Sequence, residues 1–145
     1  MENKHASETA IETPSCVEDR FWVYANRQTG TYPDHTKRGG KWLVFVPVET
    51  HDDVWQTVKL ATECGQLGGI AKAATARPNK NRNSNDEKVI CVYTYDADDS
   101  DDVSKIRERL RELGITQKIS YKTDQATREG RYAVNGHRKI GTRYE

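Results

Sequence analysis

One eight-residue segment, KWLVFVPV at residues 41–48, constrains the fold more than any other part of the chain. Its alternate positions are apolar on both sides, with Trp42, Val44 and Val46 on one side and Leu43, Phe45 and Pro47 on the other. A strand with apolar side chains on both sides is typical of the centre of a sheet, where both faces are covered. Residues 41–47 therefore predict a central strand that ends near Pro47.

Other segments predict further strands and two helices. Apolar or β-branched runs predict strands at residues 21–25, 67–76, 89–95 and 118–123, and a short final strand at residues 139–143. Helices are expected close to residues 52–64 and 100–113, while the rest of the chain after residue 123 reads as loops. Each helix has a single apolar stripe to bury, so both should pack on the same face of the sheet. The order of elements predicts an α+β fold with a mostly antiparallel sheet.

The first helix carries signals at both of its ends. Thr50 is expected to be its N-cap, with Asp53 three residues later in the capping-box position. Gly65 is expected to stop it, because glycine readily takes the left-handed conformation that follows a helix.

An acidic segment at residues 96–102 precedes the second helix and allows two interpretations. Asp99 or Ser100 can cap the helix, and acids in the first turn with arginines in the last turn complement the helix dipole. The alternative is a calcium or magnesium site. An EF-hand loop that starts at Asp96 needs Gly at its sixth position and Glu at its twelfth, but Asp101 and Arg107 stand there. We therefore interpret the segment as a helix start and expect no metal site.

Length and composition predict one soluble domain. Residues 1–18 are polar and without sustained periodicity, so we expect a flexible leader followed by a single α+β domain over residues 19–145. The chain has no apolar run near 18 residues and no signal-peptide pattern, which predicts a cytoplasmic protein without a membrane segment. The three cysteines are far apart and form no CxxC motif, so neither a zinc site nor a disulfide framework is indicated.

Two basic segments are the strongest candidates for a binding site. The net charge is only +1, but residues 72–88 hold five bases against two acids, and residues 114–145 hold seven against three. The candidate ligand-binding residues are Lys72, Arg77, Lys122, Asp124, Thr127, Arg128 and Tyr132. Cations beside hydroxyl groups suit a phosphate or sulfate, which needs charge and directed donors. One pocket would require the strands at 68–76 and 118–123 to lie close together. The alternatives are a solvated charged face and an Asp124 that pairs with Lys122 or Arg128.

Five segments together carry a resemblance to a known family. They are GGKWLVFVP, DDVW, GQLGGIAKAATARPN, VICVYTYDADDSDDVSKIRERLRELG and YKTDQATREGRY. Over about residues 20–133 the chain resembles the family of the basophilic-leukaemia-expressed protein. The resemblance implies a fold like that of the mRNA cap-binding translation initiation factor, which is a curved antiparallel sheet backed by helices, with a concave ligand face.

The likeness to the initiation factor is partial. Lys41 and Trp42 resemble the basic-Trp strand of that factor, and Trp55 resembles a helix Trp that faces partner proteins there. Trp55 would then mark a docking surface, whereas its place in an amphipathic helix predicts a core position. The pair of Trp side chains that would sandwich a cap is missing, since no Trp lies between Trp42 and Trp55 and none follows Trp55.

Some family members are catalogued as phosphothreonine lyases, by resemblance to bacterial effector enzymes. That elimination needs a base, an acid and cations that bind phosphate. Lys72 or Lys122 would be the base, with Arg77 and Arg128 as the clamp, but among the histidines only His137 lies near the basic segments. Exposed positions are expected for His35 and His51, and none of the four histidines is at metal spacing from another.

These observations favour a module that binds a phosphorylated ligand on a basic concave sheet face and uses no cofactor. The ligand would be a nucleotide, an RNA end or a phosphopeptide. A phosphothreonine-lyase-like enzyme and a protein-docking module that uses Trp55 are the two alternatives.

Overall fold

The computed structural model describes residues 12–78, 86–128 and 143–145. Within these residues, six strands form one antiparallel sheet in the order β1-β3-β4-β2-β5-β6. The strands are β1 (Trp22–Asn26), β2 (Gly40–Pro47), β3 (Ile70–Ala74), β4 (Glu87–Thr94), β5 (Ser120–Thr123) and β6 (Arg143–Tyr144). The longest strands, β2 and β4, pair in the middle of the sheet, as the apolar runs predicted.

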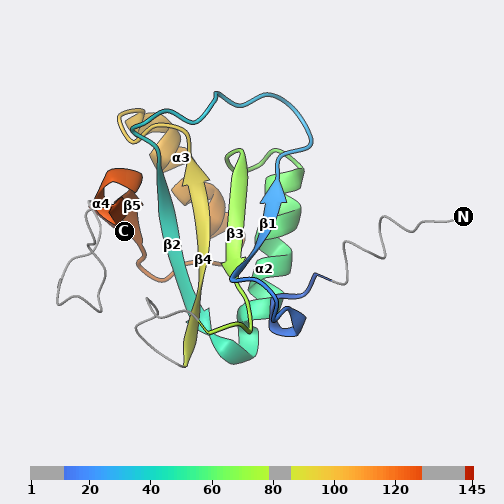
Figure 1. Ribbon diagram of the computed structural model, residues 1–145. Helices are drawn as coiled ribbons and strands as arrows, with labels where there is room; N and C mark the ends of the chain where they lie inside the picture. The colour runs from blue at the N-terminus through green and yellow to red at the C-terminus, as the bar shows by residue number, and fades with distance from the viewer. Residues whose placement is uncertain (1–11, 79–85, 129–142) are drawn as a thin grey trace, which may run out of the picture.

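Two long helices cover one face of the sheet. Figure 1 shows α2 (Val48–Glu63) and α3 (Ser100–Glu112) on the same side, behind the strands. Their apolar stripes meet alternate strand residues such as Val23, Ala73 and Val44, which are buried in the core. The indole Nε1 of Trp42 donates a hydrogen bond to the carbonyl of Val103 in α3, at 3.1 Å, and this bond joins the central strand to the helix. The predicted α+β architecture is therefore confirmed.

The expected start of the first helix was wrong, whereas that of the second was right. Helix α2 begins at Val48, directly after Pro47, so Thr50 lies inside the first turn and its hydroxyl donates back to the Pro47 carbonyl at 3.3 Å. The backbone of Pro47 is extended, and its fixed φ starts the helix without a side-chain cap. Asp99 caps α3 by accepting a hydrogen bond from the amide of Asp102 at 3.1 Å.

Two short helices lie where coil was expected. The packed chain begins before residue 19, because a 3-10 helix (η1, Pro14–Cys16) precedes Val17, whose carbonyl accepts a hydrogen bond from Ala76. After β5 the chain forms α4 (Asp124–Arg128) in place of the expected loop. Most of the strand expected at 139–143 lies outside the described residues. No helix in the described part of the chain is long and apolar enough to span a membrane.

Candidate functional site

Three lysine side chains project from the sheet face opposite the helices. Lys41 in β2 pairs directly with Lys122 in β5 and with Tyr93 in β4. Lys72 in β3 pairs with Cys91, which precedes Tyr93 by two residues. Paired residues, and residues two apart on one strand, point to the same face. Lys41, Lys72 and Lys122 therefore share one face, and we call them the lysine cluster.

The strands that carry Lys72 and Lys122 are not neighbours, although a single pocket for these two residues would require them to lie close together. Strands β4 and β2 lie between β3 and β5, which sets the backbones of Lys72 and Lys122 about 14 Å apart across the sheet. Lys41 fills this gap from β2. It was not among the predicted ligand-binding residues, although it stands at the centre of the cluster.

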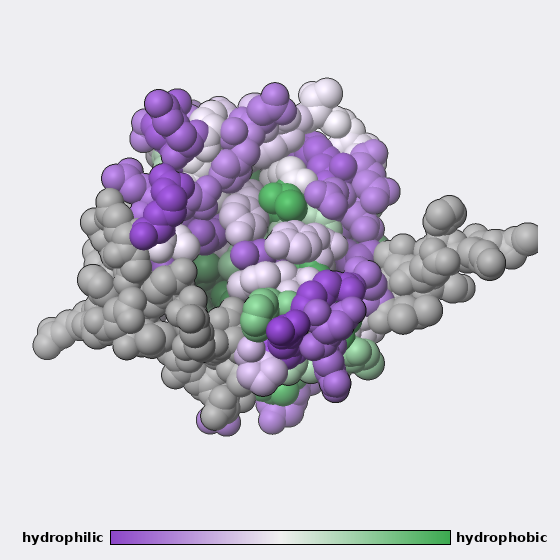
Figure 2. Space-filling view, in the orientation of Figure 1, coloured by the Kyte–Doolittle hydropathy of each residue, from purple (hydrophilic) through white to green (hydrophobic). Residues whose placement is uncertain are grey.

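Aromatic rings lie beneath the ammonium groups. Nζ of Lys72 lies 3.8 Å from the ring centroid of Trp22 and 5.9 Å from that of Tyr93, and Nζ of Lys41 lies 5.6 Å from the same Tyr93 centroid. The negative faces of aromatic rings attract such cations. Figure 2 shows this side of the molecule, where pale and green side chains occupy the middle of the sheet and purple, hydrophilic ones surround them.

A hydrogen-bond network joins Lys41 to α4 and to the loop before β2. Nζ of Lys41 donates to Oδ1 of Asp124 at 3.1 Å and to Oγ1 of Thr127 at 2.8 Å. The other carboxylate oxygen of Asp124 lies 2.7 Å from Nε2 of His35. A carboxylate can only accept, so this ring nitrogen carries the proton. Asp124 and Thr127 were predicted as site residues, whereas the participation of His35 was not predicted.

The acidic segment before α3 holds the loop that carries His35. Three side-chain contacts tie the loop down: Tyr32 Oη to Asp102 Oδ2 at 2.6 Å, Thr36 Oγ1 to Asp96 Oδ2 at 3.0 Å, and Arg38 Nη2 to Asp96 Oδ2 at 2.7 Å. These carboxylates thus position the loop as well as starting a helix. The absence of a metal site here stays a prediction.

Two adjacent glycines make room on opposite faces at the start of β2. A Cβ on Gly39 would lie 1.9 Å from Nε2 of His35, so the imidazole packs directly against this backbone. A Cβ on Gly40 would lie 2.3 Å from the hydroxyl of Tyr121, on the helix side. Any larger residue at Gly39 displaces His35 from Asp124.

Burial and mutual repulsion perturb the charges of the cluster. Burial, followed by the positive charge of Lys41, lowers the pKa of Lys122 to about 8. Burial is also the main cause that lowers the pKa of Lys72, and Lys41 contributes again. Burial alone would raise the pKa of Asp124, but the hydrogen bond from His35 and the charge of Lys41 hold it below its ordinary value. Burial and mutual repulsion therefore disfavour the protonated forms of the lysines on this face.

Several predicted site residues lie elsewhere. Arg77 donates to the carbonyl of Asp19 at 3.1 Å and lies over the ring of Phe21, beyond the end of β3 that is farther from Lys41. Arg128 is exposed at the end of α4. Tyr132 and His137 lie outside the described residues. Asp124 forms ion pairs with Lys41 and with His35, which the sequence had not suggested as its partners.

Trp55 and His51 are both buried, which confirms the core position predicted for Trp55 from its amphipathic helix and shows that the exposed position expected for His51 was wrong. Trp55 is 1% exposed and belongs to the core, so its ring offers no docking surface. His51 is 2% exposed, with Nε2 3.2 Å from the carbonyl of Val89, and burial lowers its pKa. His35 keeps a partly exposed side chain, as the loop sequence predicted.

The family comparison covers the same part of the chain as the site. The model of one family, described as basophilic leukemia-expressed protein Bles03, matches residues 34–128, about two thirds of the chain. The chain belongs to the Bles03 family. The Bles03 match includes the whole lysine cluster, together with His35, Asp124 and Thr127. It begins after β1, so Trp22 lies outside the matched residues.

Proposed function

We propose that this protein binds a phosphorylated ligand on the sheet face opposite the helices, through Lys41, Lys72 and Lys122. The observation that carries the proposal is the burial of like charges at close quarters. Lys41 is 7% exposed and Lys122 is 3% exposed, although they lie directly opposite each other. A bound phosphate would offset both the repulsion and the lost hydration.

The low exposure of these side chains argues against a merely solvated charged face. Lysines on a solvated face keep their ammonium groups in water and show no desolvation. Burial instead lowers the pKa of Lys72 and Lys122. One carboxylate, from Asp124, contacts Lys41 and offsets part of the repulsion among the three lysines.

Replacing Lys41 or Lys72 by methionine is expected to weaken the binding of a phosphorylated probe by about 10- to 100-fold. A charged hydrogen bond in a partly enclosed site contributes about 1.5 to 3 kcal/mol, and methionine keeps the apolar stem of the side chain. The probes are inorganic phosphate, a nucleoside monophosphate and a phosphothreonine peptide, each organic probe with its unphosphorylated counterpart. Binding is measured by calorimetry at two salt concentrations.

Lys105→Met is the matched control for these variants. Lys105 is exposed on α3, on the other side of the sheet, so its loss should leave binding unchanged. If salt strongly weakens the binding of phosphate to the wild type, the lysine–phosphate contacts are exposed to solvent, because salt screens exposed charges more than buried ones. The proposal fails if none of the three probes binds, or if both cluster variants bind as tightly as Lys105→Met.

One observation favours a phosphothreonine-lyase-like enzyme as a second candidate. A general acid was lacking in the sequence pattern, and the His35–Asp124 pair beside Lys41 supplies a candidate. Lys122, with its pKa lowered to about 8, holds some neutral amine near neutral pH. In this reaction the amine takes the Cα proton, and the electron pair of the broken Cα–H bond forms the Cα=Cβ bond. The Cβ–O bond then breaks, and the phosphate leaves with a proton from His35.

Mass spectrometry of a phosphothreonine peptide tests the second candidate. Elimination removes phosphoric acid and leaves dehydrobutyrine, whereas hydrolysis restores threonine. Lys122→Met and His35→Gln should each abolish formation of dehydrobutyrine, while Lys105→Met should not. A peptide that binds and is recovered intact would exclude the lyase and leave the binding proposal standing.

A further inference from the structure

Strand β1 forms an edge of the sheet with a regular row of outward-facing backbone groups. It pairs with β3 on one side, and no other strand in the described part of the chain pairs with it. The hydrogen bonds from Thr75 to the Phe21 carbonyl and from Arg27 to the Gly69 carbonyl lie just beyond its two ends. In an antiparallel ladder such bonds use alternate residues. The amides and carbonyls of Trp22, Tyr24 and Asn26 therefore point away from the sheet.

This edge lacks the features that usually prevent strand pairing. Exposed edge strands are protected by lysine, proline, bulges or very short length. Strand β1 is five residues long, with the sequence WVYAN, and carries neither a charge nor a proline. Tyr24 is 50% exposed. Among the residues that the structure describes, no strand blocks the addition of a strand at this edge.

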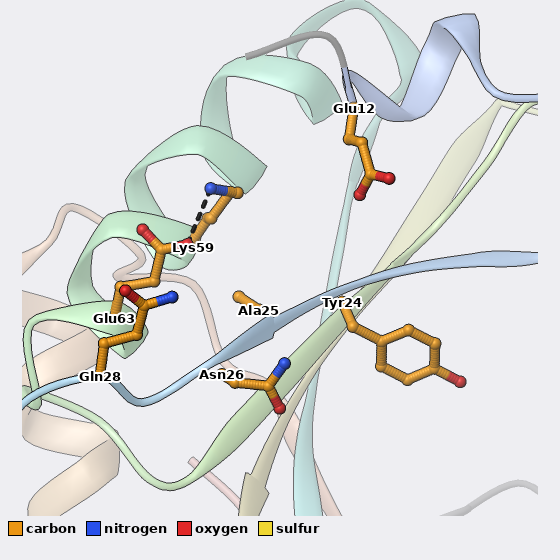
Figure 3. A pocket seen from close by; sticks show the side chains of 7 residues that line it. All are labelled: Glu12, Tyr24, Ala25, Asn26, Gln28, Lys59 and Glu63. Carbon is orange, nitrogen blue, oxygen red and sulfur yellow. Dashed lines mark hydrogen bonds and ion pairs between the residues drawn. The ribbon is translucent and has the colours of Figure 1, made fainter. Parts of the chain in front are cut away.

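A polar hollow lies beside the same edge, between β1 and α2. Its volume is about 270 Å³, and it is lined by Glu12, Tyr24, Ala25, Asn26, Gln28, Lys59 and Glu63. Figure 3 shows Ala25 directed toward the helix and the ring of Tyr24 turned away from it. Lys59 and Glu63 form an ion pair at 2.8 Å at one wall. The small side chain of Ala25 leaves space where a residue opposite it on an added strand would place its side chain.

We propose that an extended peptide segment of a partner protein binds along β1 as an additional strand, with a lysine or arginine side chain in this hollow. Addition of a strand supplies main-chain hydrogen bonds for affinity, and a pocket for alternate side chains supplies specificity. Of the described lining residues, Glu12 pairs with Arg20 at 2.7 Å and Glu63 pairs with Lys59 at 2.8 Å. Each carboxylate has a second oxygen that can accept a further hydrogen bond, and the amide oxygens of Asn26 and Gln28 are acceptors too. A basic side chain uses these acceptors.

A second copy of this chain fits the edge less well. Twofold pairing of β1 with itself about Tyr24 would place Val23 of the second copy opposite Ala25. Val23 is 1% exposed and occupies its own core, so it cannot enter the hollow. The side chain of a bound peptide is not buried in a core of its own, so it can enter the hollow.

The test uses seven-residue peptides of the sequence Thr-Val-Thr-Xaa-Thr-Val-Thr, capped at both ends, with lysine, arginine, glutamine or glutamate at Xaa. Binding is followed by amide hydrogen exchange of the full chain. The lysine and arginine peptides should slow exchange at Trp22, Tyr24 and Asn26 and leave Val23 and Ala25 unchanged. They should bind about tenfold or more tightly than the glutamate peptide.

Two variants at one position separate the backbone from the side chain. Tyr24→Pro removes an outward N–H that the pairing with β3 does not use, so the fold should persist while peptide binding falls by about tenfold or more. Tyr24→Ala keeps that N–H and should bind within a few-fold of the wild type. Circular dichroism verifies that both variants are folded.

Three outcomes would overturn the proposal. The first is that no peptide protects the three outward amides. The second is that folded Tyr24→Pro binds as the wild type does. The third is protection of these amides that rises with protein concentration without peptide, because it would assign the edge to a second copy.

Discussion

Replacing the buried Arg107 by methionine is expected to lower the free energy of unfolding by about 2 to 4 kcal/mol. Arg107 is 1% exposed, and its guanidinium donates to three backbone carbonyls: Nε to Glu145 at 2.9 Å, Nη1 to Ile115 at 3.0 Å and Nη2 to Gln117 at 2.7 Å. Methionine fills similar space but donates to none of these carbonyls. The Glu145 carbonyl keeps its hydrogen bond from the Ile119 amide, whereas Ile115, which is buried, and Gln117 lose this donor. Each buried acceptor left unsatisfied costs about 1 to 3 kcal/mol.

Arg109→Met is the matched control for this prediction. Arg109 lies on the same helix with a 43% exposed side chain and a 3.9 Å ion pair to Glu112. Its loss should cost under about 1 kcal/mol. Urea denaturation of both variants measures the difference. Equal midpoints would mean that the carbonyls find other donors, and the structural role assigned to Arg107 would be wrong.

Arg107 also illustrates which features the sequence could not reveal. Its place in an arginine-rich last part of a helix predicted a complement to the helix dipole. Its actual partners are main-chain carbonyls in the segment after α3 and at Glu145. Backbone acceptors exist at every residue, so they leave no signature in the sequence. The burial of this arginine follows only from the tertiary fold.

The elements themselves could be predicted because their signals are local. The doubly apolar run at β2, the apolar run at β4 and the single stripe of α3 each contain their own pattern. The single apolar stripe of each helix also predicted that both helices pack on the same face of the sheet, as Figure 1 shows. The start of α2 was misplaced because Pro47 can both end a strand and precede a helix, and the sequence signal of Thr50 competed with it.

The residues of the candidate site were predicted only in part, because their arrangement depends on strand order and on a loop. Lys72, Lys122, Asp124 and Thr127 stood out as members of basic segments. Lys41 lies in an apolar run, and it became central only because β2 lies between β4 and β5. His35 comes from the loop before β2, and its position depends on contacts with the distant acidic segment. Such contacts are set by packing, and periodicity does not encode them.

Binding of inorganic phosphate should weaken by about tenfold or more as the pH rises from 7 to 10. Burial and then the charge of Lys41 lower the pKa of Lys122 to about 8, so above that pH the ammonium loses its proton and its attraction for the anion. The pKa of Lys72 is lowered in the same direction by burial and adds to the loss. Phosphate itself only becomes more negative as the pH rises, so its own titration does not explain weaker binding.

The stability of the free protein should change in the opposite direction, which separates this loss from alkaline unfolding. The pKa of an unfolded lysine is about 10.4. Below about pH 8 Lys122 is protonated in both states, and the cost of burying its charge is fully present. Between about 8 and 10.4 the unfolded chain binds more protons, so the contribution of Lys122 to stability rises with pH. Lys122→Met should flatten both trends, whereas Lys105→Met should keep them. Calorimetric titrations and urea denaturation at each pH measure the two trends, and an equally steep loss of binding in Lys122→Met would assign the titration to another group.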